Sequence, residues 1–177
     1  METLQSTGDF NSGNRKTQRM NSDLNEIDSR VKRAVDFFEQ GYNCSQAVFM
    51  AYSDKYGIDT QTAARLATSF GGGMGRLREV CGAVSGMFLV LGLEFPYIDT
   101  KDKASKNLNY KMVQKVANAF KAEMGSYVCA DLLKIKHVPQ NPVSAERNEA
   151  YYKSRPCTRC VALAAKLVGD EIVDKVE

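Results

Sequence analysis

The sequence predicts an all-α fold, a single-domain irregular helical bundle of about seven or eight helices. Apolar residues recur at helical spacing in several segments, and residues suited to helix caps and stops separate those segments. No run of alternating β-branched residues indicates a strand. With 177 residues, 44% of them hydrophobic and 25% charged, the chain can bury one core and needs no second domain.

The chain divides at about residue 21. Residues 1–21 are rich in polar side chains and glycine and have almost no spaced apolar positions, so we expect a disordered polar N-terminal arm. Residues 22–177 are expected to form the helical, cysteine-containing domain. Its first helix is predicted to start at Ser22 and to stop at Gly41. Its inward stripe is Leu24, Ile27, Val31, Ala34, Val35 and Phe38.

Two shorter helices are expected next. Asn43 can cap a helix that runs to about Tyr56, and Thr60 can open another that runs to about Phe70. The glycine-rich segment 71–75 breaks the chain after them. It lacks the spacing of a phosphate-binding P-loop, so a connector between buried helices is the more economical interpretation.

The apolar stretch 80–93 predicts a buried central helix, because it is shorter than the roughly 20 residues that cross a bilayer. No membrane span is therefore predicted. Its small residues Gly82, Ala83 and Gly86 would let neighbouring backbones, or a partner or substrate, come close to Cys81.

The C-terminal half predicts three further helices. A long surface helix is expected beyond Pro96 and ends near Gly125, and a short helix covers about 129–134. After a proline-containing loop, Pro156 suits the start of the last helix.

Composition limits the class of partner. A net charge of +3 with dispersed lysines argues against nucleic-acid binding. The first residues have no basic region followed by an apolar run, so no signal or transit peptide is expected and a cytoplasmic location is predicted. The chain names no specific redox partner or small-molecule substrate, and a homodimer through an exposed helix face has no specific marker.

The five cysteines carry the strongest functional signal, because each stands where a helix is predicted to begin. The unpaired N–H groups of a helix start stabilise a thiolate and lower the pKa of the thiol. Five are too few for a disulfide scaffold in a domain of this size. The candidate site residues are Cys44, Cys81, Cys129, Cys157 and Cys160.

Cys157 and Cys160 are spaced so that two sulfurs on one helical turn come within bonding reach. In a redox interpretation Cys157 attacks and Cys160 resolves, with Arg155 or Arg159 adding positive charge. In a metal interpretation both are thiolate ligands of zinc or an iron–sulfur cluster, completed by two other cysteines. The simplest alternative is two thiols packed as small hydrophobic groups.

The other three cysteines are single in the sequence, and a single buried cysteine is usually inert packing. Only a bundle whose helix starts converge would bring them together. Glu79 is a candidate proton acceptor for Cys81, although a charge that stabilises the helix dipole is the more economical interpretation. His137, the single histidine, is expected to be a solvated loop residue.

The run Cys81-Gly82-Ala83-Val84-Ser85-Gly86 resembles the signature of the C_GCAxxG_C_C family, to which redox activity is ascribed. Cys44 upstream, Cys129 downstream and a cysteine that opens the last helix follow the family's order over about residues 30–170. The resemblance implies a small, helical, cytoplasmic redox protein. Its four characteristic cysteines would be Cys44, Cys81, Cys129 and one of Cys157 or Cys160.

Three functional hypotheses follow. The first is a thiol-based redox protein, similar to a thiol/disulfide oxidoreductase, whose cysteines meet in one partly buried pocket and cycle between thiol and disulfide. The second is a metal-binding protein that uses four of the same cysteines for zinc or an iron–sulfur cluster. The third is a helical interaction module in which the cysteines are structural.

Overall fold

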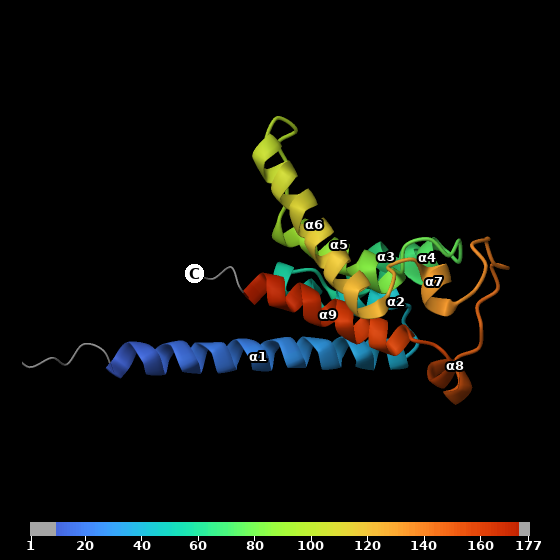
Figure 1. The fold of residues 1–177 in the computed structure, drawn as a ribbon, viewed down its shortest axis with the longest axis horizontal. Coiled ribbons are helices and arrows are strands. Elements are labelled where there is room, and N and C mark those ends of the chain that lie inside the picture. Colours follow the sequence, from blue (N-terminus) through green and yellow to red (C-terminus); the bar gives the residue numbers. More distant parts are fainter. Residues whose placement is uncertain (1–9, 174–177) are drawn as a thin grey trace, which may run out of the picture.

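The computed structural model describes residues 10–173, and that part of the chain is built from helices (Figure 1). No strand is assigned within it, and the one β-type pairing is an isolated antiparallel bridge between Val80 and Val128. The predicted all-α fold class is therefore confirmed.

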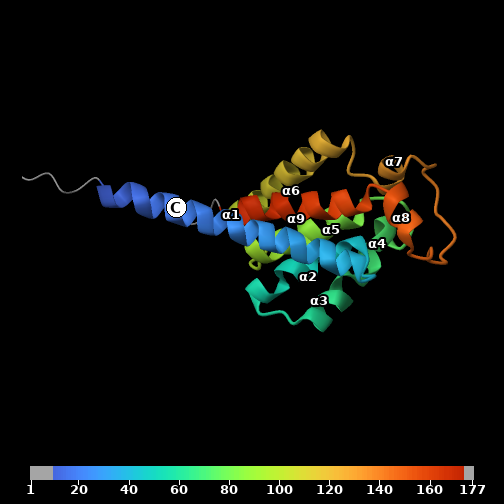
Figure 2. The same cartoon turned by 90° about the horizontal axis from the view of Figure 1, so that it is seen from below.

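Four helices form the centre of the bundle. The long helix α1 (Phe10–Glu39) lies along α9 (Cys157–Val173), and α2 (Cys44–Tyr52) packs against α5 (Gly82–Glu94) (Figure 2). α1 also contacts α2, and α9 also contacts α5, so the four helices enclose one continuous core. Fully buried side chains from all four helices fill that core: Phe38, Val48, Met50, Val84, Met87, Leu91, Val161 and Val168.

The remaining elements surround this centre. They are the 3₁₀ turns η1 (Ser53–Tyr56) and η2 (Thr68–Phe70), and the helical segments α3 (Thr60–Ala67), α4 (Gly71–Met74), α6 (Lys103–Met124), α7 (Cys129–Leu133) and α8 (Glu149–Ser154). α6 leaves the bundle at a steep angle, whereas α4, α7 and α8 gather at the end where α9 begins (Figure 1). α4 contains left-handed backbone at Gly72 and Gly73, so it is a glycine turn more than a helix.

Several helix boundaries agree with the sequence prediction. Asn43 caps α2 in a capping box with Gln46, in which each side chain accepts from the other residue's backbone N–H. Gly125 ends α6 in the left-handed conformation. The third helix starts at Thr60, as predicted, with Asp59 as its cap. Short polar caps are thus sufficient to locate these ends.

The start of the first helix differs from the prediction. α1 begins at Phe10, so residues 10–21, which the sequence places in a polar arm, are helical; residues 1–9 of that arm lie outside the described residues. Figure 1 shows this part of α1 extending beyond the other helices. Once a helix is nucleated by its packed half, each further residue adds a hydrogen bond at little cost. Polar residues can therefore continue the helix without an apolar stripe.

Helix α8 has no counterpart in the prediction. It is six residues long, and the side chain of Asn148 accepts from the backbone N–H of Tyr151 to cap it. A helix of this length spans fewer than two turns and has no apolar periodicity to detect.

Close packing between α2 and α5 depends on Gly86. A Cβ atom at this position would lie 2.6 Å from the carbonyl oxygen of Ser45 and 3.0 Å from Cβ of Val48. Gly82 is similarly close to Cys44, because its Cβ would lie 3.2 Å from that of the cysteine. The small residues of α5 therefore bring Cys44 and Cys81 together.

Within the described residues no helix combines the length and the apolar composition needed to cross a membrane.

Candidate functional site: a cavity lined by five cysteines

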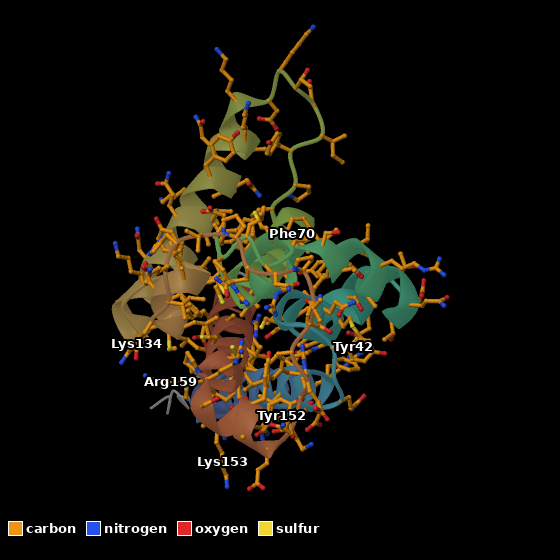
Figure 3. All side chains as sticks on the ribbon, turned by 90° about the vertical axis from the view of Figure 1, so that its right-hand side faces the viewer. Tyr42, Phe70, Lys134, Tyr152, Lys153 and Arg159 are labelled. Carbon is orange, nitrogen blue, oxygen red and sulfur yellow. The ribbon has the colours of Figure 1, made fainter. Side chains whose placement is uncertain are left out.

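All five cysteines line one cavity of about 60 Å³. Cys44, Cys129 and Cys157 are the first residues of α2, α7 and α9, Cys81 is the N-cap of α5, and Cys160 follows one turn into α9. Four of the five cysteines therefore lie at helix starts, as predicted, and the fifth lies one turn further along. Figure 3 looks onto this end of the molecule, where the labelled Tyr42, Lys134 and Tyr152 are seen.

A short backbone pairing holds Cys81 and Cys129 side by side. The N–H of Cys81 donates to the carbonyl of Tyr127 at 2.8 Å, and the N–H of Cys129 donates to the carbonyl of Glu79 at 2.7 Å. Val80 and Val128 form the bridge between these two bonds. The pairing fixes the start of α7 against the start of α5.

The glycine turn closes over the same cysteine. Gly73 has φ of 70°, and a Cβ atom there would lie 2.6 Å from Cβ of Cys129. Glycine meets both requirements, because it accepts left-handed backbone and adds no side chain. The glycine-rich segment therefore packs directly against Cys129 at the site.

The two cysteines of the C-x-x-C sequence face different partners. Cys157 interacts with Cys44 and Cys160 interacts with Cys81, and each interaction shifts the pKa values of its two thiols in opposite directions. The C-x-x-C spacing predicts a pair of Cys157 with Cys160, whereas the structure contains two cross-helix thiol pairs, Cys44 with Cys157 and Cys81 with Cys160. All five cysteines are free thiols.

Cys157 is a thiol that is disposed to ionise. The hydrogen bond donated by Cys44 lowers the pKa of Cys157 to about 7, and the positive charges of Arg155, Arg147 and Arg78 act in the same direction against the opposing effect of burial. The same hydrogen bond, with burial, raises the pKa of Cys44 well above its ordinary value. Cys44 therefore stays protonated and donates to the Cys157 thiolate.

The second pair has the same asymmetry. Donation from Cys160 lowers the pKa of Cys81 against the effect of burial, and the backbone amides of Ala83 and Val84 at the start of α5 help. The pKa of Cys160 is raised, first by this hydrogen bond and then by burial. Cys157 is only half-buried, whereas the other four cysteines are buried, so Cys157 is the most accessible of the five.

Cys129 pairs with an arginine. Nη1 of Arg78 donates to its sulfur at 3.7 Å. Burial nevertheless raises the pKa of Cys129, and the guanidinium only partly opposes that effect. Cys129 is therefore a neutral thiol held next to a buried cation.

Sequence reasoning missed most of the polar wall. Besides Arg155, which it named, the cavity is lined by Arg78, Arg147 and Tyr151. Tyr151 holds two of the guanidiniums, since the central carbon of Arg155 lies 4.4 Å and that of Arg147 lies 5.6 Å from the centre of its ring. None of these residues belongs to a motif, and only their distance from the cysteines in the fold reveals them.

Other residues named from the sequence lie elsewhere. Glu79 and His137 do not line the cavity, and Nε2 of His137 lies 2.6 Å from a carboxylate oxygen of Asp131 on the surface. Arg159 is exposed and donates to the carbonyl of Glu123. Of the small residues, Gly82 lines the cavity, Gly86 is covered by α2, and Ala83 is fully buried.

Among the described residues, no three or more His, Cys, Asp or Glu side chains are arranged to hold one metal ion together. The five sulfurs are distributed as two pairs and one arginine-bound thiol, and a four-coordinate zinc site needs four ligands around one point.

The fold and the site define a class of protein: a small helical bundle with two thiol pairs and three arginines around one cavity. Residues 42–171 match the family model described as "Putative redox-active protein (C_GCAxxG_C_C)", and the chain belongs to this family. The matched residues contain all five cysteines and the three cavity arginines. No curated protein and no solved structure matched the chain in the same comparisons.

Proposed function

We propose that this redox-active protein is a dithiol reductant in which Cys157 is the nucleophile and Cys44 is the resolving thiol. The observation that carries the proposal is that Cys44 and Cys157, the first residues of α2 and α9, line one cavity, where their interaction lowers the pKa of Cys157 and raises that of Cys44. A thiolate attacks disulfides, whereas a thiol does not, and a pKa near ambient pH gives the most effective attacking group.

The reaction has two steps, written here for a disulfide as the oxidised partner. The Cys157 thiolate attacks one partner sulfur, forms a mixed disulfide and releases the other partner sulfur as a thiolate. That thiolate takes a proton from solvent. The sulfur of Cys44 then attacks the sulfur of Cys157, which breaks the mixed disulfide and forms the Cys44–Cys157 disulfide. The proton of Cys44 passes to the second partner sulfur, which leaves as a thiol. The two cysteines are oxidised by two electrons, and the partner disulfide is reduced by two.

The second pair, Cys81 and Cys160, is suited to the same thiol–disulfide chemistry but lies deeper in the protein. Cys81 and Cys160 are buried, so a bulky partner cannot reach them directly. Cys160 lies on the same helical turn as Cys157. We therefore propose that the inner pair exchanges its electrons through the outer pair and that Cys129 is the leftover thiol.

The test is anaerobic native intact mass spectrometry combined with thiol titration. We expect an apo mass, five titratable thiols in the reduced protein, and a stepwise loss of two thiols and then four on mild oxidation with oxidised glutathione. Dithiothreitol should restore all five. Cys157→Ser should prevent the first step, whereas Cys129→Ser should leave it intact and serves as the matched control.

Two results would contradict the proposal. An added mass of zinc or an iron–sulfur core that disappears in cysteine variants would make the site a metal centre. Five thiols that stay reduced under oxidation, without bound metal, would make the cysteines structural and the chain an interaction module.

A further inference from the structure

Arg78 is buried with an unused hydrogen-bond donor. Only 5% of the residue is exposed, and it lines the cavity of the five cysteines. Its Nη1 donates to Cys129, whereas its buried Nε has no partner. Leaving a charged donor unsatisfied is costly, so such a group in a cavity indicates a ligand that is an acceptor.

The backbone at Arg78 is itself unfavourable. Its φ is 69°, in the left-handed region, and Met74 and Arg76 in the same segment also have positive φ. A residue with a Cβ atom pays about 1 kcal/mol or more for this conformation. Backbone strain of this kind persists only where the surrounding structure enforces it. Here it accompanies an arginine side chain that turns inward instead of into solvent.

The guanidinium groups of two further arginines, Arg147 and Arg155, line the same cavity. Nη1 of Arg147 is anchored by donation to the carbonyls of Phe38 and Tyr42, at 3.0 and 2.8 Å, and Arg155 stacks on Tyr151. No aspartate or glutamate is among the residues that line the cavity. Even with both Cys157 and Cys81 ionised, two negative charges would face three positive ones.

We propose that the cavity is an anion subsite, in which Arg78 and Arg155 bind a small anionic group of the substrate and hold it beside Cys157. The chemistry that fits is a carboxylate or small oxyanion, because a guanidinium donates to either in the same geometry. The cavity of about 60 Å³ has room for a group of that size. The inference rests on the proposed function in that Cys157 is the reactive thiol.

The test compares two alkylating reagents that differ in charge. Iodoacetate carries a carboxylate and iodoacetamide is neutral, and a small thiol in solution gives the reference ratio of their rates. At Cys157, located by tryptic mapping, we expect the ratio to exceed the reference by about tenfold, the scale of one hydrogen bond to a charged group. The rate with iodoacetate should also saturate with its concentration.

Two variants and two competing ions locate the effect. Arg78→Met and Arg155→Met should return the ratio toward the reference, whereas Arg159→Met, an exposed arginine on the same helix as Cys157, should not change it. Arg155→Met keeps the test decisive if Arg78→Met does not fold, as judged by circular dichroism. Sulfate that slows iodoacetate supports an oxyanion as the natural group, and acetate that does so supports a carboxylate.

A ratio equal to the reference with non-saturating kinetics overturns the proposal, as does a raised ratio that survives both variants. Alkylation needs no disulfide formation. A raised ratio in a protein that forms no disulfide would therefore sink the proposed function and leave the anion subsite standing.

Discussion

Cys157 combines three physical effects that no single neighbour provides. A thiol donates to its sulfur, arginines surround it, and it is the least buried of the five cysteines. The hydrogen bond from Cys44 is the largest of the influences on its pKa. The lowered pKa of Cys157 therefore depends on Cys44 and not on the helix start alone.

The pH dependence of alkylation at Cys157 tests whether Cys44 lowers the pKa of its thiol. Only the thiolate reacts, so the rate with iodoacetamide should rise with pH and reach half its maximum near the pKa of about 7. Below that pH the sulfur is protonated and unreactive. Cys44→Ala removes the donor and should move the midpoint to higher pH, whereas Cys44→Ser keeps a donor and should move it less.

The charge contribution can be separated from the hydrogen bond. Arg155→Met should also raise the midpoint, because its positive charge favours the thiolate. Arg159→Met is the matched control, since Arg159 is exposed and does not line the cavity. Equal midpoints in wild type and in both Cys44→Ala and Arg155→Met would show that neither neighbour sets the pKa.

The C-x-x-C spacing shows which cysteine contacts can be predicted from the sequence and which cannot. It correctly identifies Cys157 and Cys160 as two sulfurs of one turn. It cannot tell that each of them faces a cysteine more than seventy residues away, because that depends on which helix starts meet in space. Arg78 was missed for the same reason.

At the scale of elements, glycines bring the helices together and so build the site. Gly86 allows α2 to contact α5, and Gly73 allows the glycine turn to contact Cys129. The small residues of segment 82–86 predict close packing of neighbouring helices, and they also predict that a substrate can come close to Cys81. Gly86 is covered by α2, so its role is packing.

Two glycines of α5 give a matched pair of substitutions. Gly86→Ala places a Cβ atom 2.6 Å from a backbone oxygen, so we expect a loss of about 1–3 kcal/mol in the free energy of unfolding, measured with urea. Gly92→Ala in the same helix meets nothing within 4 Å and should gain about 0.5–1 kcal/mol. A loss in Gly92→Ala, or none in Gly86→Ala, would contradict this account of packing.

Helical periodicity was a good guide to elements with a long apolar stripe and a clear cap. α2, α6 and α9 are found close to their predicted positions. The polar first part of α1 and the short α8 carry no stripe, and the bridge between Val80 and Val128 is a single residue pair without a period. Local pattern therefore located most helices and could not show that Cys81 and Cys129 are tied together.

Over the whole molecule, the two thiol pairs connect α9 to α2 and to α5, three of the four central helices. Oxidation would turn these contacts into covalent cross-links between distant parts of the chain. The proposed disulfide formation would therefore couple the redox state to the stability of the fold.

This coupling predicts a more stable oxidised protein. A Cys44–Cys157 disulfide closes a loop of more than about 100 residues, which in the chain-entropy model stabilises the fold by up to roughly 4–5 kcal/mol. The unfolding midpoint in urea should rise on oxidation and return on reduction. Cys157→Ser should lose most of that gain and Cys129→Ser should keep it; an oxidised form less stable than the reduced one would count against the pairing.

The most direct measurement is the disulfide connectivity of the mildly oxidised protein, read by mass spectrometry of a non-reduced tryptic digest. Trypsin cleaves after Arg159, between Cys157 and Cys160, and all five cysteines fall on separate peptides, so every linkage can be told apart. The account predicts peptides that join Cys44 to Cys157 first and Cys81 to Cys160 with further oxidation. A dominant link between Cys157 and Cys160, or one from Cys157 to Cys129, would contradict the cross-helix pairs on which the account depends.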